Sequence, residues 1–411
     1  MNIRSMDPKP NVVLFDEGRR QNTSAICLES GDGFCYVGHA ELKNLLWELY
    51  RLPGRQSQRM ERKCQELYEG WGIQLPDVNC NYLSCAVGVV YGTSQKLAIR
   101  KEIERIAEDV TGRGYSNLCY LGIGGTYASA LQAQSHVQEN SGMEIIAQNA
   151  ALYNTTGNRR IGENTVVVLS SVTGTTQEVV EAVEKVKALG AVVIGFVDKA
   201  DTPLEKLSDY SIRYPQNEQL KFFMLADRLM YLAGDYPQYE KQYAEYDRYL
   251  PQALVDTEKA ADEFGKRFAE KHCEDAMHYF VGAGNQYGST YSYAMCYWEE
   301  QHWLRSKSIH AAEFFHGTLE IVDKNTPVTL FMGEDSQRPL AERVKNFLPR
   351  VCGNYTVIDS AEYPLVGISP EFRGDISHLV THAVTQRIDA HMEQINRHPM
   401  EIRRYYRQFP Y

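Results

Sequence analysis

The residues of this chain best suited to chemistry are the hydroxyls and the glycine of residues 171–176 (SVTGTT). They follow a β-branched, strand-like run at 165–170 and precede a helical pattern. A turn from strand to helix presents unpaired backbone N–H groups and the positive end of the helix dipole, which together bind anions. The side chains of Ser171, Thr173 and Thr176 can add donors. We therefore predict a phosphate-binding loop, although an ordinary helix cap uses the same residue types.

A second loop of this kind, residues 122–127 (GIGGTY), strengthens the prediction. Gly124 and Gly125 let the backbone approach an anion closely, and Thr126 offers a hydroxyl. The fingerprint of dinucleotide sites has Gly or Ala where this chain has Tyr127, and the lysine of a nucleotide P-loop is absent. The two loops therefore favour a compact phosphate monoester over a dinucleotide or a nucleoside triphosphate.

Candidate acid and base groups gather in residues 297–317, which are rich in Glu, His and aromatic side chains. Glu and His are suited to moving protons between carbon atoms at neutral pH. Aromatic residues at helical spacing are also typical of a core, so composition alone leaves both interpretations open. His378 and His382 lack the spacing of a zinc motif and indicate an ordinary helix face, and we predict no metal site.

Composition limits the class of protein. A chain of 411 residues has room for two domains, and the net charge of −10 argues against nucleic acid or an anionic membrane as the main partner. Nine scattered cysteines without C-x-x-C spacing predict reduced thiols in a cytoplasmic protein. No segment is apolar enough to predict a membrane span.

The order of the predicted elements indicates an α/β protein with parallel sheets and helices on both faces. Residues 1–80 are an extension of unknown role, with helical runs at 41–52 and 58–69; residues 81–250 form a first α/β unit and residues 251–411 a second. In the first unit we predict strands at 118–122, 143–147, 165–170, 191–197 and 209–213, with helices at 98–111, 126–139, 175–189, 202–208 and 217–234. In the second we predict strands at 277–281, 327–332 and 355–358, with helices at 252–271, 288–303 and 339–348. Only the first unit keeps both hydroxyl-rich loops.

The two loops and the Glu- and His-rich segment resemble those of the sugar isomerase (SIS) domain proteins, which are paired flavodoxin-like units that bind phosphosugars. The second half is most similar to the fructosamine-6-phosphate deglycases and, more distantly, to the isomerase domain of glucosamine-6-phosphate synthase. In both, a glutamate precedes a histidine by sixteen positions, as Glu300 precedes His316 here, and the histidine opens a motif that reads HGTLE at 316–320. The strings EFFHGTLEIV and HPMEIRRYY look particularly like the deglycases. The resemblance covers roughly residues 80–411.

The resemblance implies a site. The implied phosphate ligands are Gly124, Gly125, Thr126, Ser171, Thr173 and Thr176. Glu300 and His316 would divide the acid and base roles, with Glu300 favoured as the acid. Beyond this, we predict that Glu313 orients His316 or faces solvent, and that Glu218 and Gln219 reach the sugar hydroxyls. In the family the histidine comes from the neighbouring subunit, which implies a homodimer or a higher homo-oligomer with a shared site.

The implied reaction is hydrolysis of a 6-phosphofructosyl amine to glucose 6-phosphate and a free amine, without a metal or an organic cofactor. The sequence does not say which amine is released. Thr318 replaces the usual proline of the motif, which should alter only the local turn, whereas Tyr297 in place of the lysine of the synthase weakens the resemblance to the synthase. The alternatives are a phosphosugar isomerase or an amino-sugar-phosphate deaminase, and a non-enzymatic phosphosugar sensor. The basic tail 403–407 would either close over the site or lie in solvent.

Overall fold

The computed structural model describes residues 25–30, 33–38, 97–213 and 219–408. The chain divides into two compact units, Met1–Gly88 and Val89–Tyr411. The described part of the first unit is an antiparallel hairpin of β1 (Ala25–Ser30) and β2 (Gly33–Gly38). The helices predicted before residue 70 lie outside the described residues.

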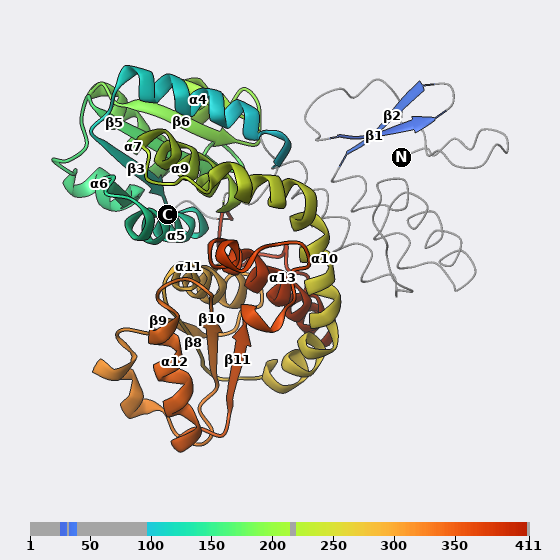
Figure 1. Cartoon of the computed structure of the whole chain (residues 1–411). Coiled ribbons are helices and arrows are strands. Elements are labelled where there is room, and N and C mark those ends of the chain that lie inside the picture. Colours follow the sequence, from blue (N-terminus) through green and yellow to red (C-terminus); the bar gives the residue numbers. More distant parts are fainter. Residues whose placement is uncertain (1–24, 31–32, 39–96, 214–218, 409–411) are drawn as a thin grey trace. The chain divides into compact units, whose positions relative to one another are not determined.

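The first half of the larger unit is built on a parallel sheet (Figure 1), which has five strands in the order β4-β3-β5-β6-β7. Its strands are β3 (Asn117–Gly122), β4 (Ile145–Asn149), β5 (Thr165–Ser171), β6 (Val192–Val197) and β7 (Tyr210–Ile212). This is the flavodoxin-type order, and the direction of winding reverses between β3 and β5. Ligands of such sheets bind at that reversal, beyond the carboxyl ends of the strands.

Helices cover both faces of this sheet because its strands bury alternate side chains on opposite sides. In β5, Val166 and Val168 belong to one core cluster, whereas Val167 and Leu169 belong to another. The first cluster includes buried residues of α4 (Arg100–Arg113), α5 (Gly125–Asn140) and α9 (Gln219–Ala233). The second includes those of α6 (Ala150–Thr156), α7 (Gln177–Ala188) and α8 (Pro203–Leu207).

The second half repeats the arrangement with four parallel strands in the order β11-β10-β8-β9. Its strands are β8 (His278–Gly282), β9 (Ser306–His310), β10 (Val328–Met332) and β11 (Tyr355–Asp359). One face packs on α12 (Arg338–Phe347), and the other on α10 (Tyr239–His272) and α13 (Pro370–Asn396). The prediction of two α/β units with parallel sheets is confirmed.

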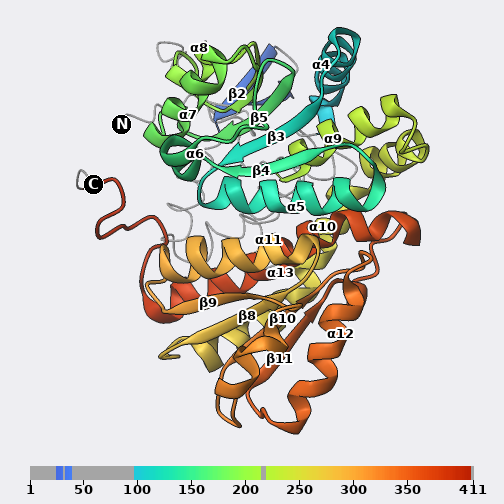
Figure 2. The same ribbon diagram turned by 90° about the vertical axis from the view of Figure 1, so that its left-hand side faces the viewer.

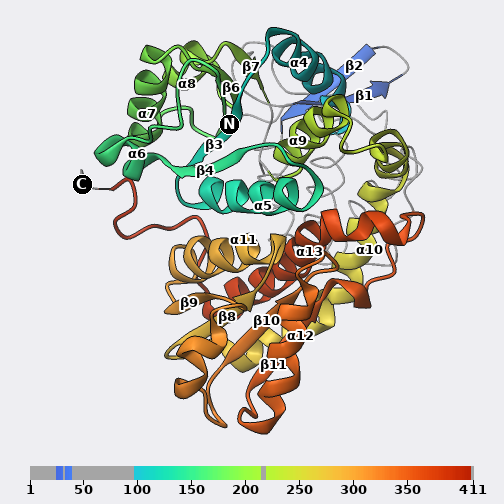
Figure 3. The same cartoon turned by 60° about the vertical axis from the view of Figure 1, so that its left-hand side comes forward.

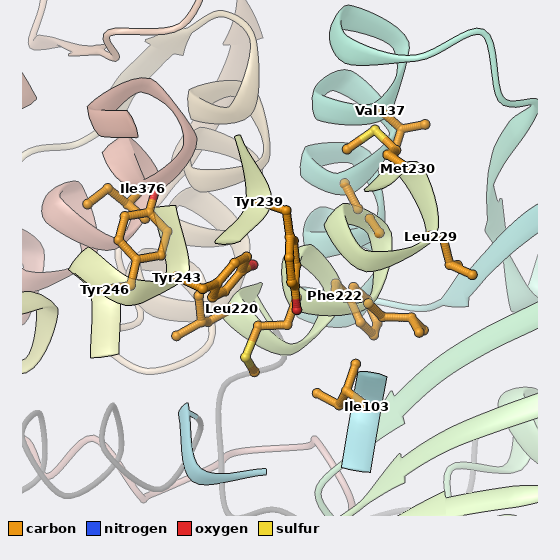
Figure 4. Packing of buried hydrophobic residues seen from close by; sticks show 14 of the residues in the cluster. Ile103, Val137, Leu220, Phe222, Leu229, Met230, Tyr239, Tyr243, Tyr246 and Ile376 are labelled. Atoms are coloured by element: carbon orange, nitrogen blue, oxygen red, sulfur yellow. The ribbon is translucent and has the colours of Figure 1, made fainter. Parts of the chain in front are cut away.

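Helix α10 joins the two halves through their cores. Tyr239, Tyr243 and Tyr246, near its start, pack into the core of the first half (Figure 4), whereas Ala261 and Phe268 belong to a core cluster of the second. The helix begins well before the predicted residue 252 and includes residue 250, so the division of the chain at that point stays a prediction. No helix within the described ranges, α10 included, is long and apolar enough to cross a membrane.

Elements that were not predicted include strand β9, helix α6 and the hairpin of β1 and β2. Strand β9 lies at the edge of the second sheet. Its sequence, SKSIH, is mainly polar and lacks the apolar pattern that predicts a strand. Helix α6 has seven residues, AALYNTT, and its cap is the Asn149 side chain, which accepts a hydrogen bond from the backbone N–H of Leu152. Short elements of this kind depend on tertiary contacts rather than on local pattern.

A buried ionic network fastens α5, α9, α10 and α13 together. His136 Nε2 lies 2.5 Å from Asp227 Oδ1, and His136 Nδ1 lies 3.3 Å from Asp375 Oδ1. Tyr243 donates a hydrogen bond to Asp227, and Tyr236 donates one to Asp375. Burial would lower the pKa of His136, but the two carboxylates outweigh it and raise the pKa to about 10. Although desolvation raises the pKa of Asp227 as well, its short contact with His136 favours a charged pair.

This network predicts a loss of stability at alkaline pH. Because the folded pKa of His136 lies above the unfolded value of about 6.5, its contribution is complete below that value and is lost as the pH rises toward 10. We expect the free energy of unfolding to fall by about 1.4 kcal/mol per pH unit from this group across that window. Urea denaturation between pH 6.5 and pH 10 measures the slope. His136→Gln should be less stable at pH 7 and should lack the slope; equal slopes in the two proteins would contradict the assignment.

Candidate active site

The two predicted phosphate loops lie side by side at one edge of the first sheet. Strands β3 and β5 pair in parallel, with Leu121 opposite Leu169, so the loops after them leave the same edge. This edge is at the reversal of the strand order, where such folds bind ligands. The structure therefore brings together the six predicted phosphate residues: Gly124, Gly125, Thr126, Ser171, Thr173 and Thr176.

The first loop is held by its own threonine. Thr126 Oγ1 accepts a hydrogen bond from the backbone N–H of Ile123 and donates one to the Ile123 carbonyl. Gly124 caps α5 at φ +60°, a conformation that favours glycine. The first turn of α5 carries no acidic residue, so the positive end of the helix is not neutralised from within.

The second loop is shaped by Ser171 and leaves Thr176 for other partners. Ser171 Oγ accepts a hydrogen bond from the backbone N–H of Gly174, which has φ +66°. Thr176 occupies the N-cap position of α7, but its side chain makes no capping hydrogen bond. Instead, the hydroxyls of Thr173 and Thr176 both accept from Arg407 Nη2, at 3.4 Å each.

Helices α5 and α11 (Asn285–Ser292) pack antiparallel (Figures 2 and 3), which brings the segment that leads to Glu300 to the start of α5. A Cβ added to Gly125, at the start of α5, would lie 3.6 Å from Cys296 Sγ and 3.8 Å from Ser292 Oγ. After α11 the chain forms a π-helix, Tyr293–Glu299, which Glu300 caps by donating its backbone N–H to the Met295 carbonyl. Because π-helical turns are frequent at functional sites, the position of Glu300 at the end of one is consistent with a functional role.

Asp389 of α13 fixes both ends of the segment that carries Glu300. Its Oδ1 accepts a hydrogen bond from Tyr293 at 2.9 Å and lies 2.9 Å from His302 Nε2. All three side chains are buried. The carboxylate of Glu300 itself accepts a 2.8 Å hydrogen bond from Arg403 Nε, within an ion pair.

His316 belongs to a different segment from Glu300, on the other side of strand β9 in the chain order. It is exposed and ends the 3₁₀ turn Phe314–His316, whose Phe314 is buried, beside a surface pocket of about 490 Å³ that Phe315, Arg343 and Phe347 help to line. In the described part of the chain, no hydrogen bond or ion pair joins His316 to Glu300 or to the phosphate loops. Glu313 is also exposed and accepts the backbone N–H of His316 through its carbonyl. The roles of His316 and Glu313 stay predictions, and Glu218 lies outside the described residues.

In the second half, a carboxylate occupies the position that corresponds to the phosphate loops. Asp335, after β10, accepts hydrogen bonds from the backbone N–H groups of Asn285 and Gln337, and a Cβ on Gly284 would lie 2.4 Å from it. Desolvation raises the pKa of Asp335 to about 6, so the group is mainly anionic at neutral pH. A resident anion at the start of α11 explains physically why this half would not bind phosphate there.

One cluster of potential metal ligands occurs among the described residues, away from these loops. His272, Asp275 and His278 offer ligand atoms within 4.8 Å of one another. Asp275 already accepts hydrogen bonds from both histidines, and these outweigh desolvation and lower its pKa to about 2. Burial lowers the pKa of His278 to about 4, and its other nitrogen lies 2.8 Å from Thr329 Oγ1. Asp275 therefore already links the two histidines by hydrogen bonds, whereas the buried His272 Nε2 has no hydrogen-bond partner among the described residues.

Comparisons with known proteins agree with this geometry. Residues 114–229, which contain both phosphate loops, match the SIS domain family. The chain contains a SIS domain. The predicted resemblance to this family is confirmed.

Two of the relatives whose match extends beyond this SIS domain are deglycases. Fructosamine deglycase FrlB of Bacillus subtilis is 26% identical over 320 residues, 75% of this chain and 96% of its own length. Fructoselysine 6-phosphate deglycase of Escherichia coli is 27% identical over 267 residues, 63% of this chain and 78% of its own. A candidate phosphosugar isomerase of B. subtilis superposes with a TM-score of 0.72 at 25% identity, covering 77% of this chain and all of that structure.

Sequence reasoning missed the partners of Glu300. Asp389 lies 87 positions from His302 and belongs to a helix whose pattern indicates only burial. Arg403 belongs to the basic tail, for which a covering role was one of two predictions, and no local signal connects it to a particular carboxylate. Both contacts arise from tertiary packing.

Gly174 tests the geometry of the second loop. A Cβ at this position would lie 2.1 Å from Thr202 Oγ1, and the backbone has φ +66°. We expect Gly174→Ala to lower the free energy of unfolding by about 1–3 kcal/mol, because clash and backbone strain both act. Gly142→Ala, with nothing within 4 Å of the added Cβ, is the matched control and should be close to neutral. Urea denaturation measures both; equal stability of the two variants would show that the loop does not need a glycine.

Proposed function

We propose that this chain is a deglycase that hydrolyses a 6-phosphofructosyl amine to glucose 6-phosphate and a free amine. The substrate class follows the names of the two deglycase relatives and the two loops suited to a phosphate monoester. The antiparallel packing of α5 on the segment that leads to Glu300 is the observation that carries the proposal. This packing supports a site in which the Glu300 carboxylate acts beside the phosphate loops of the same chain.

The spacing between these groups suits a sugar phosphate. Arg403 contacts Glu300 and Arg407 contacts Thr173 and Thr176, and the two arginines are four residues apart. Four residues of extended chain span at most ~14 Å between Cα atoms. A hexose phosphate anchored in the loops would therefore present its reducing end toward Glu300, and this remote anchor supplies orientation.

The reaction needs proton transfers and water. A base removes a proton from C1 of the open-chain ketosamine while an acid protonates the C2 oxygen, which gives an enaminol. Reprotonation at C2 yields an aldose imine. Water then adds to the C1–N double bond, and the C1–N bond breaks to release the amine and glucose 6-phosphate. We assign these transfers to Glu300 and His316, each worth roughly 10²–10⁴ in rate.

We propose that His316 acts in the site of a second copy of this chain. The exposed position of His316, without a contact to Glu300 in the described chain, supports this assignment. A closed dimer would bring the His316 turn of each subunit to the Glu300 of the other. Glu313, at the start of the same turn, would orient the imidazole.

Substitution of Glu300 tests the reaction. We expect Glu300→Gln to lower kcat roughly 10²–10⁴-fold for glucose 6-phosphate release from fructoselysine 6-phosphate, because the amide cannot exchange a proton in the same way. Glu299→Gln is the matched control, since that exposed neighbour is outside the proposed site. Wild-type protein that interconverts fructose 6-phosphate and glucose 6-phosphate, but releases no amine from a panel of phosphorylated fructosyl amines, would identify an isomerase instead.

Mixing two inactive variants tests the shared site. When Glu300→Gln and His316→Ala proteins are unfolded and refolded together, each mixed dimer has one site with both groups intact. We expect roughly a quarter of wild-type activity from statistical mixing, whereas each variant alone stays inactive. Coupled detection of glucose 6-phosphate measures the recovery. Absence of recovery, with mixed dimers demonstrated by a tag on one variant, would place both groups in one subunit.

A further inference from the structure

The last described residues, 397–408, form a strap that runs from the second half toward the first (Figures 2 and 3). It begins at Arg397, which caps α13 in the left-handed conformation at φ 50°. Trp303 fastens its middle, because the rings of His398 and Trp303 lie 4.0 Å apart and the Arg404 guanidinium lies 4.0 Å from the Trp303 ring. Trp303 is three residues after Glu300, so the strap is anchored beside the candidate active site.

Arg403 fixes the strap to Glu300. Its Nε donates to the Glu300 carboxylate at 2.8 Å, and its Nη1 donates to the carbonyls of Met400 and Ile402. A guanidinium held by backbone carbonyls on one side presents the other side in a fixed direction. The ion pair therefore restrains the position of the Glu300 carboxylate.

Arg407 brings a positive charge to the phosphate loops. Residues 122–127 and 171–176 contain no Lys or Arg, although a phosphate monoester carries nearly two negative charges at neutral pH. The Arg407 guanidinium reaches the Thr173 and Thr176 hydroxyls at 3.4 Å, the long end of the hydrogen-bonding range. No carboxylate among the described residues pairs with Arg407. An unneutralised cation thus lies loosely over hydroxyls and a helix N-terminus.

We propose that Arg407 is a direct ligand of the substrate phosphate, and that Arg403, on the same strap, positions Glu300 for the reaction. A phosphate between the loops and Arg407 would replace two long contacts with charge-assisted hydrogen bonds, which the planar guanidinium can make in pairs. Because the two arginines are four residues apart, occupation of the phosphate site orders the segment that restrains Glu300. The proposal deepens the deglycase function and rests on it only for the identity of the sugar phosphate.

Phosphate binding tests Arg407 without any turnover. Titration calorimetry with inorganic phosphate and with glucose 6-phosphate compares wild-type protein, Arg407→Ala, Arg407→Lys and the control Arg267→Ala. We expect Arg407→Ala to bind both ligands roughly 10–100-fold more weakly, since a charge-assisted contact is lost. Arg407→Lys should recover part of this affinity as a point charge. Arg267→Ala removes an equal charge from an exposed pair with Glu263 and should bind as wild type does.

Measurement of kcat and KM distinguishes the proposed role of Arg407 from that of Arg403. Arg407→Ala should raise KM with a smaller change in kcat, whereas Arg403→Ala should lower kcat roughly 10–100-fold while phosphate affinity stays near wild type. Arg403→Lys should restore part of kcat if the cation positions Glu300. A merely structural strap would change both parameters together in both variants.

The outcomes distinguish this proposal from the deglycase function. Unchanged phosphate affinity in Arg407→Ala, or no phosphate binding by the wild-type protein at millimolar concentration, would overturn the role of Arg407 even if deglycase turnover is found. Weakened phosphate binding in Arg407→Ala, with no deglycase turnover in wild type, would support Arg407 as a phosphate ligand and overturn only the proposed reaction.

Discussion

The antiparallel contact between α5 and α11 is the constraint on which the site depends. Gly288 makes it possible, because a Cβ there would lie 2.6 Å from the Ala128 carbonyl oxygen and 2.3 Å from Gln132 Cγ. The Gln132 amide donates to the Asn285 carbonyl and to Ser289 Oγ, at 3.0 Å each. Each helix follows the first strand of its half, so the anion-binding start of one lies beside the far end of the other. Neither half could assemble the site alone.

The same contact explains why the two halves are not equivalent. Antiparallel packing also brings the start of α11 near the far end of α5, where Ser336 donates its backbone N–H to Glu139. Asp335 already supplies a negative charge at that helix start, held by two backbone N–H groups. A second phosphate there would meet two carboxylates in a chain whose net charge is −10. The second half thus has a similar turn at its helix start, but its own carboxylate occupies that turn.

The loops and most of the α/β order could be predicted because their signals are local. Residues 171–176 follow a β-branched run whose seven strand residues are all buried, and the hydroxyls come directly after it. Strand β9 was not predicted, because its polar sequence at the edge of the sheet has no run of β-branched residues. The restraint of the Glu300 segment by Asp389 joins residues almost ninety positions apart, and the His316 turn shows no contact with Glu300 in one chain. Local sequence cannot specify contacts that tertiary packing or a second copy creates.

Binding of the substrate phosphate can affect the position of the Glu300 carboxylate only through groups that contact both. The strap provides such a path, since Arg407 lies over the loops, Arg403 holds Glu300, and Trp303 anchors the residues between them. The partly exposed ion pair of Arg403 and Glu300 alone would contribute little, because solvent screens it and side-chain entropy opposes it. A phosphate that orders Arg407 lowers this entropic cost for the neighbouring residues as well. Interaction with a non-reacting part of the substrate would then hold Glu300 in place at the reacting carbons, which is how remote binding energy lowers a chemical barrier.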